Sequence, residues 1–281
     1  MLKTPTPELM RIAQSRAIRE DVGTTASWTY QGQGPTIVLI HGFRGDHHGL
    51  SAIAGALEGY RVLIPDLPGY GKSPELNAEH NLENYAAWLI DYVKAIGSEV
   101  VVAGHSFGSL IVAQAHASGL KTKATVLINP ISTTASASAT GKLAGLYYRL
   151  GRFGWLGSYL LKSALVVRLM SVSMATTKNW SLRGFIHEQH LRYFSNYQSD
   201  RVALEGFAAA NNANVLSFAP ALSANLLLIA GEKDLIAPLS GQFALQKATG
   251  ARLETLSVGH LTHYETPADV AALIRDFLGG L

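Results

Sequence analysis

Six short runs of nearly uninterrupted apolar residues recur along the chain. They are rich in β-branched residues, a pattern typical of strands that are covered on both faces, as in parallel sheets. The runs cover residues 36–40, 61–65, 99–104, 124–129, 225–231 and 252–258. Amphipathic stretches with helical spacing lie between them, at residues 49–57, 82–96, 108–117, 239–249 and 268–278. This alternation predicts an α/β fold with a mostly parallel central sheet flanked by helices.

The alternation changes at two places. Upstream of the first run, residues 15–20 and 24–30 predict an antiparallel start to the sheet. Later, about 90 residues separate the fourth run from the fifth. A structureless loop of that length is uncommon in a compact domain, and this interval has helical periodicity. We therefore expect a core formed by residues 1–130 and 220–281, with a mostly helical insertion over residues 131–219.

Composition narrows the class of protein. Of the 281 residues, 48% are hydrophobic and only 15% are charged, which excludes a disordered chain. Cysteine is absent, which excludes a disulfide scaffold, thiol chemistry and cysteine-ligated zinc. The net charge of +3 is too small to indicate a nucleic-acid partner. The first residues contain prolines and scattered charges and no apolar segment typical of a signal peptide, so we expect a cytoplasmic protein.

The sharpest chemical signal is Gly-His-Ser-Phe-Gly at residues 104–108, directly after an apolar run and at the start of a helical stretch. In this context G-x-S-x-G indicates a tight strand-to-helix turn that exposes its serine above the carboxyl edge of the sheet. The start of the helix adds free N–H groups and a positive partial charge. Ser106 is therefore the candidate nucleophile, and the alternative is a turn without chemistry.

A serine hydroxyl is a weak nucleophile and needs a base, which a carboxylate then orients. His260 and His263 both follow the last predicted strand. We choose His260 because it follows that strand more closely, and treat His263 as a competitor or a pocket residue. For the carboxylate we choose Asp234, which follows the strand at residues 225–231, over Glu232.

The loop that begins at His41 follows the first apolar run. The backbone N–H groups of Phe43 and Phe107 can converge on the oxygen that becomes negative when serine attacks a carbonyl group. We expect His41 to shape this loop or line the pocket, because two bases would otherwise compete for one serine. We expect His47 and His48 at the entrance or on the surface. His187 and His190 have helical spacing but no matched third ligand, so no metal site is predicted.

These segments together resemble the serine α/β-hydrolases that carry a cap domain. The resemblance rests on HGF at 41–43, DLPGYGKS at 66–73, GHSFG at 104–108, GEKDLIAP at 231–238 and VGHLTHYETP at 258–267. The segments occur in the order of the family and span the predicted core. The resemblance implies an α/β-hydrolase fold in which the insertion is a helical cap.

By the same resemblance, Ser106 is the nucleophile, Asp234 the acid and His260 the base, with the amides of Phe43 and Phe107 as oxyanion donors. A serine at the nucleophile position, in place of aspartate, argues against an epoxide hydrolase or a haloalkane dehalogenase. We therefore expect an esterase that cleaves a small or medium apolar carboxylic ester through an acyl-enzyme, without a cofactor. Two alternatives stay open: a lyase or perhydrolase that uses the same residues, and a ligand-binding receptor or scaffold with little activity.

The insertion combines aromatic and basic residues. Its aromatic side chains can either line the substrate pocket or pack against the core, and the candidates are Tyr147, Tyr148, Phe153, Trp155 and Tyr159. Residues 131–200 contain eight Lys or Arg and two acids, a net charge of +6, which leaves −3 for the rest of the chain. This surplus could steer anionic substrates or contact an anionic membrane, although a solvated face is the simpler interpretation. The oligomeric state is left open.

Overall fold

The computed structural model describes residues 4–97, 99–134, 136, 139–222 and 224–281. Its centre is an eight-stranded sheet with the strand order β1-β2-β4-β3-β5-β6-β7-β8. The strands are β1 (Ala17–Arg19), β2 (Ser27–Tyr30), β3 (Gly34–Ile40), β4 (Tyr60–Pro65), β5 (Val100–His105), β6 (Ala124–Ile128), β7 (Leu226–Gly231) and β8 (Arg252–Leu256). Strands β3 to β8 are parallel, whereas β1 and β2 form the antiparallel start. The predicted α/β fold is confirmed, and each apolar run matches a strand to within two residues.

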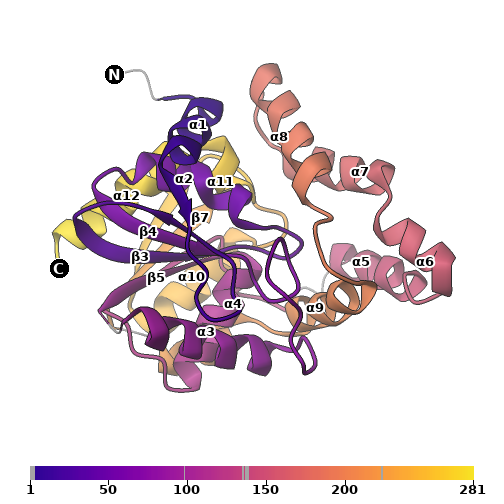
Figure 1. The fold of residues 1–281 in the computed structure, drawn as a ribbon, viewed down its shortest axis with the longest axis horizontal. Helices are drawn as coiled ribbons and strands as arrows, with labels where there is room; N and C mark the ends of the chain where they lie inside the picture. The colour runs from indigo at the N-terminus through magenta and orange to yellow at the C-terminus, as the bar shows by residue number, and fades with distance from the viewer. Residues whose placement is uncertain (1–3, 98, 135, 137–138, 223) are drawn as a thin grey trace.

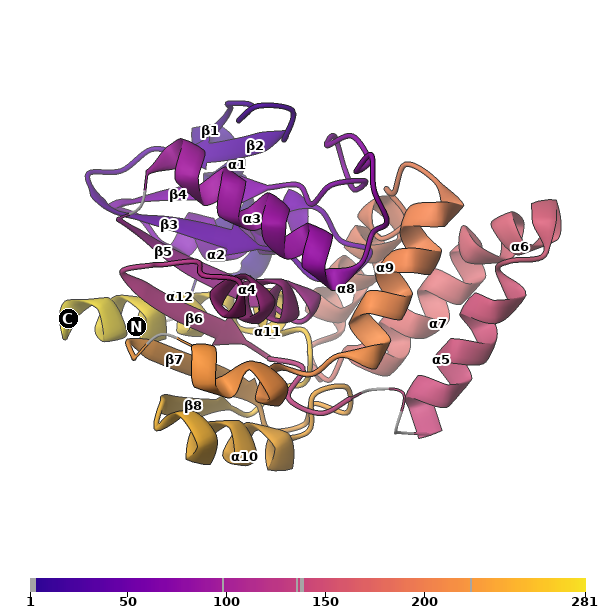
Figure 2. The ribbon, with the colours of Figure 1, turned by 90° about the horizontal axis from the view of Figure 1, so that it is seen from below.

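Helices cover both faces of this sheet (Figure 2). The helices of the core are α1 (Thr6–Arg16), η1 (His47–Leu50), α2 (Ser51–Ala56), α3 (Leu82–Ile96), α4 (Phe107–Ala117), α10 (Leu239–Thr249), α11 (Thr262–Glu265) and α12 (Pro267–Gly279). The sequence pattern did not predict α1, which has a proline in its first turn. Proline is compatible with that position because the first N–H groups of a helix have no partner inside it.

Strand β3 shows why the apolar runs lack alternation. Ile37 and Leu39 belong to the apolar core on the side of α2 and α12, whereas Val38 and Ile40 belong to the core on the side of α3 and α4. All four side chains are fully buried. A strand between two helical layers therefore needs apolar residues at every position.

The chain between β6 and β7 extends away from the sheet (Figure 1). Its described part forms α5 (Ala139–Leu150), α6 (Gly154–Leu161), α7 (Ala164–Met174), α8 (Trp180–Tyr193) and α9 (Asp200–Asn212). The 3-10 helix η3 (Val215–Ala221) then packs against α4 and leads into β7. We call the segment from α5 to α9 the helical insertion.

Candidate active site

Ser106 lies at the turn between β5 and α4 with a φ of 53° and a ψ of −117°. Such a backbone conformation costs about 1–3 kcal/mol in a residue with a Cβ atom. The surrounding structure holds it: the Ser106 N–H donates to the carbonyl oxygen of Ile128 at 3.0 Å. The two glycines of the motif, Gly104 and Gly108, allow neighbouring backbone segments to pass close to this turn. A Cβ atom on Gly108 would lie 2.3 Å from the carbonyl oxygen of Ile40, and one on Gly104 would lie 2.5 Å from that of Gly108.

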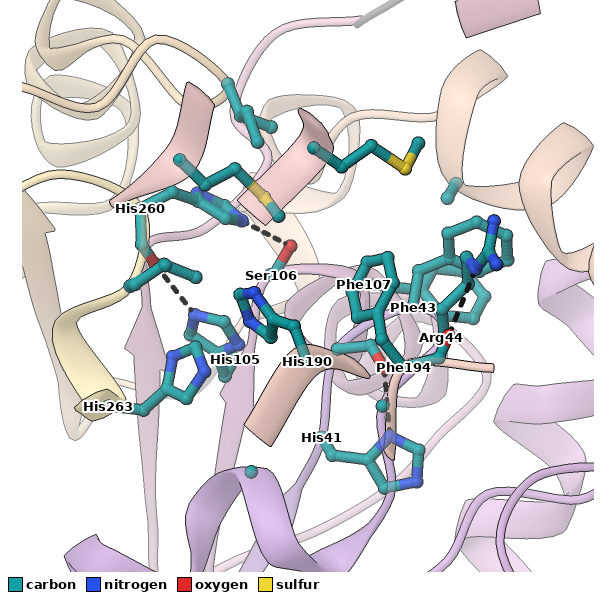
Figure 3. A pocket seen from close by; sticks show the side chains of 18 of the residues that line it. His41, Phe43, Arg44, His105, Ser106, Phe107, His190, Phe194, His260 and His263 are labelled. Carbon is teal, nitrogen blue, oxygen red and sulfur yellow. Dashed lines mark hydrogen bonds between the residues drawn. The ribbon is translucent and has the colours of Figure 1, made fainter. Parts of the chain in front are cut away.

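Three side chains from loops that follow three different strands meet beside this turn. His260 Nε2 lies 2.7 Å from Ser106 Oγ (Figure 3), and His260 Nδ1 lies 2.7 Å from Asp234 Oδ2. Because the carboxylate accepts the proton on Nδ1, Nε2 carries a lone pair and can accept the serine proton. Glu232, the competing acid, is exposed, and its carboxylate accepts hydrogen bonds from Thr255 and Ser257. The structure thus brings together the three residues chosen from the sequence, and their catalytic roles stay a prediction.

The carboxylate of Asp234 is buried and fully hydrogen bonded. Its Oδ1 accepts from the N–H groups of Ile236 and Ala237, at 2.8 and 2.9 Å. Its Oδ2 accepts from Asn129 Nδ2 at 2.7 Å in addition to His260. Burial opposes ionisation, but the neighbouring His260 and these donors outweigh it and lower the pKa of Asp234 below its ordinary value. The group is therefore an anion that can hold the imidazole in place.

Asn129 is a residue of this site that the sequence analysis missed. Its Nδ2 bonds to Asp234, and its Oδ1 accepts a hydrogen bond of 2.7 Å from Thr262 Oγ1. It has a φ of 46°, in the left-handed region that asparagine enters more readily than most residues. The available signal was its position directly after β6, at the same sheet edge as the other site residues.

Two backbone amides lie beside the nucleophile. The Phe107 N–H is at the first position of α4, where a helix supplies no acceptor, and the Ser106 side chain does not cap this helix. The Phe43 N–H makes no backbone hydrogen bond within the described ranges. A Cβ atom on Gly42 would lie 3.4 Å from Ser106 Cβ, so this loop passes directly alongside the serine. The segments that carry both predicted oxyanion donors therefore flank Ser106, and their role as donors stays a prediction.

Besides His260, four buried histidines line the same pocket: His41, His105, His190 and His263. His41 Nε2 accepts from the Leu67 N–H at 2.9 Å, and its Nδ1 donates to a carbonyl of its own loop, which is the predicted shaping role. The rings of His105 and His263 lie 4.2 Å apart between centroids. Burial, with a contribution from His260, lowers the pKa of His105 to about 3, and burial lowers the pKa of His263 well below its usual range. These rings are therefore neutral at pH 7.

Ser106 faces a cavity of about 400 Å³ whose walls come from both the core and the helical insertion. The walls are largely apolar and include Phe43, Leu50, Phe107, Tyr148, Met170, Met174, Phe194 and Phe207. Among the predicted pocket residues, His41, His263 and Tyr148 line this cavity. In Figure 3, Phe107 lies next to Ser106, and Phe43 and Phe194 lie on the same side of the serine.

The prediction that Tyr147, Phe153, Trp155 and Tyr159 line the pocket was wrong. None of the four contributes to the cavity wall. Helix α6 turns Gly157 inward, so its aromatic side chains point to solvent. The Tyr147 hydroxyl donates to backbone carbonyls at the end of α6. Composition predicted aromatic wall residues, but only the tertiary structure decides which face of each helix turns inward.

Neither His47 nor His48 lines the cavity. The expectation of a surface position is wrong for His47, whereas His48 is partly exposed. His47 is buried with its Nδ1 2.9 Å from Asp66 Oδ1, and His48 Nδ1 lies 2.9 Å from Asp46 Oδ1. The His48 ring stacks on Tyr193 of α8 at 3.8 Å between centroids. One ligand atom each from Asp46, His47 and His48 lie within 4.8 Å of one another, so this cluster could hold a metal ion. Its present contacts connect the loop before α2 to the helical insertion.

His187 and His190 on α8 share one partner. Their Nδ1 atoms lie 2.6 and 2.7 Å from Ser171 Oγ on α7, so the serine hydroxyl connects the two helices. His190 also lines the cavity, and burial lowers its pKa to about 4. The pair therefore joins helices within the insertion.

Arg44 directly follows Phe43, and the sequence analysis assigned it no role. Its side chain is fully buried. Its guanidinium donates to the carbonyl oxygens of Leu161 and Phe194, at 2.7 and 3.1 Å. It also donates to the hydroxyl groups of Ser195, Tyr147 and Tyr148. These bonds use all the N–H groups of the guanidinium. Arg44 thus ties the helical insertion to the loop that carries the Phe43 amide, and has no donor left for a substrate.

A second polar connection lies next to His260. The carboxylate of Glu265 accepts from Thr176 Oγ1 at 2.6 Å and from the Thr177 N–H at 2.9 Å. Thr176 Oγ1 in turn accepts from the Gly259 N–H at 2.9 Å. The segment between α7 and α8 is therefore bonded to the loop that carries the histidine.

The fold and the site agree with one family. The model of the alpha/beta hydrolase family matches residues 37–273, and the chain belongs to that family. An (E)-2-((N-methylformamido)methylene)succinate hydrolase from Acinetobacter baylyi is 34% identical over 104 residues, which cover 34% of this chain and 38% of that protein. Lipase 1 from Psychrobacter immobilis is 38% identical over 81 residues, which cover 28% of this chain and 26% of the lipase.

The two curated relatives are thus matched over well under half of their length. A solved structure of an esterase from Thermogutta terrifontis is similar over almost the whole chain. It has a TM-score of 0.73 at 20% identity and covers 94% of this chain and 98% of that one. At this identity the similarity concerns the fold.

Proposed function

We propose that this protein is a serine hydrolase that cleaves a small or medium apolar carboxylic ester. The observation that carries the proposal is the hydrogen-bonded series from Asp234 through His260 to Ser106, which ends in an apolar cavity. Such a series activates a serine hydroxyl at neutral pH. The names of the similar proteins, a hydrolase, a lipase and an esterase, support ester hydrolysis.

In the proposed mechanism, Ser106 Oγ attacks the ester carbonyl carbon while His260 Nε2 takes the hydroxyl proton. The N–H groups of Phe43 and Phe107 donate to the oxyanion of the tetrahedral intermediate. His260 then protonates the leaving alcohol, and an acyl-enzyme remains on Ser106. Water, deprotonated by His260, attacks this ester and releases the acid and the free serine. Asp234 stays ionised and stabilises the imidazolium in both halves of the reaction.

The substrate class follows from the cavity. Its volume of about 400 Å³ lies near the lower end of the range for small-molecule pockets. Tyr148, Met170 and Met174 of the helical insertion form part of its wall, so we propose that the insertion acts as a cap over Ser106. The stacked rings of Tyr148 and Phe207, 3.9 Å apart between centroids, add rigid apolar surface. We expect short and medium acyl chains to fit and long chains to be disfavoured.

The test is hydrolysis of p-nitrophenyl esters with acyl chains from acetate to palmitate. Ser106→Ala should lower kcat/KM by about 10⁶-fold, because no other group supplies the nucleophile. Ser240→Ala, an exposed serine on α10, is the matched control and should leave turnover unchanged. Equal hydrolysis by the wild type and the Ser106→Ala variant would reject the proposal.

Two further measurements separate the alternatives. A fluorophosphonate probe should label the wild type on Ser106, and folded protein without label would indicate a binding protein. When the reaction runs in water enriched in oxygen-18, the acid product should carry the label. A product without it would indicate a lyase or a perhydrolase.

A further inference from the structure

Helices α6 and α7 and the turn before α6 expose large apolar side chains to solvent. We call them the outer apolar surface: Phe153, Trp155, Leu156, Tyr159, Leu165 and Leu169. Their exposed fractions are 67%, 78%, 58%, 75%, 69% and 61%. Large apolar side chains gathered on neighbouring exposed helices are a common feature of interaction sites.

This surface is not needed to hold the helices in place. Helix α7 buries Val167 and Ser171 and directs Met170 and Met174 to the cavity. Leu165 and Leu169, one helical turn apart, lie on its remaining face. Figures 1 and 2 both place α6 at the far end of the molecule from the sheet. A partner can therefore reach the outer apolar surface without contact with the core.

The segment that carries this surface has charges of a single sign. Residues 131–187 contain seven Lys or Arg and no Asp or Glu. Arg149, Arg152 and Arg168 lie on or beside α5 to α7 and are exposed. Within the described part of the chain, none of these three forms an ion pair. The expected partner is therefore both apolar and anionic.

A second copy of the chain fits this surface poorly, because it would place the same unpaired cations against one another. A membrane-spanning arrangement also fits poorly. Among the described helices, none is long and apolar enough to cross a bilayer by itself. Helices α6 and α7 reach that length and apolar composition only as a pair, and the pair is bent by 41°. Lys162 lies between them and Arg168 within α7. Aromatic residues beside cations on one side of a helix pair are typical of the bilayer interface.

We propose that the outer apolar surface of α6 and α7 docks on an anionic lipid bilayer, with its aromatic side chains at the headgroup level and Arg149, Arg152 and Arg168 against lipid phosphates. Helix α7 then lies between the bilayer and the cavity, because its other face carries Met170 and Met174. Docking itself does not depend on catalysis. Only its consequence, access of bilayer-dissolved esters to Ser106, rests on the proposed function.

The experiment is co-sedimentation of the full chain with vesicles of phosphatidylcholine alone and of phosphatidylcholine with phosphatidylglycerol. The wild type should bind the anionic vesicles and lose most of this binding at high salt. Exchange of Arg149, Arg152 and Arg168 for Gln should lower partitioning by about a hundredfold. The matched control exchanges three exposed lysines of the core for Gln, namely Lys94, Lys121 and Lys247. This variant loses the same amount of charge and should bind as the wild type does.

The apolar contribution is tested with Trp155→Ala, which should weaken binding by tenfold or more, on the order expected for a large buried ring. Phe243→Ala, an exposed ring on α10, is its control. All these variants should hydrolyse a soluble ester at the wild-type rate, and Ser106→Ala should bind vesicles as the wild type does. An inactive wild type that still binds would refute the proposed function alone.

Three results would overturn docking. The first is equal partitioning of the wild type to neutral and anionic vesicles. The second is equal loss of binding in the arginine variant and the lysine control. The third is an oligomer in analytical ultracentrifugation that dissociates on Trp155→Ala, which would assign the surface to a second copy of the chain.

Discussion

The carboxyl edge of the sheet and the helical insertion are built in opposite ways. At the edge, Ser106 and Asp234 follow strands whose side chains are buried throughout. In the insertion, α6 buries only Gly157 and Leu161. The residues of the proposed chemistry therefore follow densely buried strands, whereas part of the cavity wall comes from an insertion whose helix α6 packs few side chains.

Polar side chains connect the two regions next to the site. Arg44 bonds the insertion to the loop of the Phe43 amide. Thr176 of the insertion bonds to Glu265 of α11 and to the Gly259 N–H in the loop of His260. The insertion is thus hydrogen bonded to the two loops on either side of Ser106. Packing of the core therefore sets the geometry of the Ser106 site, while a few buried hydrogen bonds set the position of the cavity wall.

The largest expected effect is at the sheet edge. Asp234→Asn keeps the shape of the side chain but removes the charge that holds the proton on His260 Nδ1, so kcat should fall by about 10⁴-fold. Hydrolysis of a p-nitrophenyl ester at pH 7 measures it. Glu232→Gln, which changes the exposed acid two residues earlier, is the control and should leave kcat unchanged. A similar loss in both variants would mean that the acid has been assigned wrongly.

A smaller effect is expected where the two regions join. Arg44→Met should lower the free energy of unfolding by about 3 kcal/mol, because it leaves the buried carbonyl oxygens of Leu161 and Phe194 without donors. Hydrogen exchange should accelerate in α5 and α6 while the amides of β5 stay protected. Arg44→Lys should restore part of the protection. Equal acceleration in β5 would contradict the distinction between a rigid edge and a separately held insertion.

The smallest effect concerns the buried histidines at this junction. Because burial lowers the pKa of His263 well below its usual 6.5, the folded protein binds fewer protons than the unfolded chain below pH 6.5. The free energy of unfolding should therefore fall with acidification, by about 2 kcal/mol for this group between pH 7 and pH 5. Urea unfolding across this range measures it, and His263→Phe should flatten the profile. An unchanged pH profile in that variant would mean that folding does not lower the pKa of His263.

Much of the site could be predicted because its signals are local. Ser106 stands in a short motif after a strand, and Asp234 and His260 each follow a strand closely, so the rule that parallel strands end at one edge brings them together. Asn129 follows a strand as well, but an amide side chain carries no signature that separates a positioning residue from a turn residue. Its role depends on Asp234, which is 105 residues away.

The sequence by itself determined the strands of the core, the burial of both faces of these strands and the serine turn. Each of these features depends on neighbours within a few residues. The tertiary structure alone decided which face of α6 meets solvent and which residues join the insertion to the site. The physical reason is distance along the chain: Arg44 bonds to Leu161, 117 residues later. Periodicity reports that a helix has two faces, and only the packed neighbour determines which of them is covered.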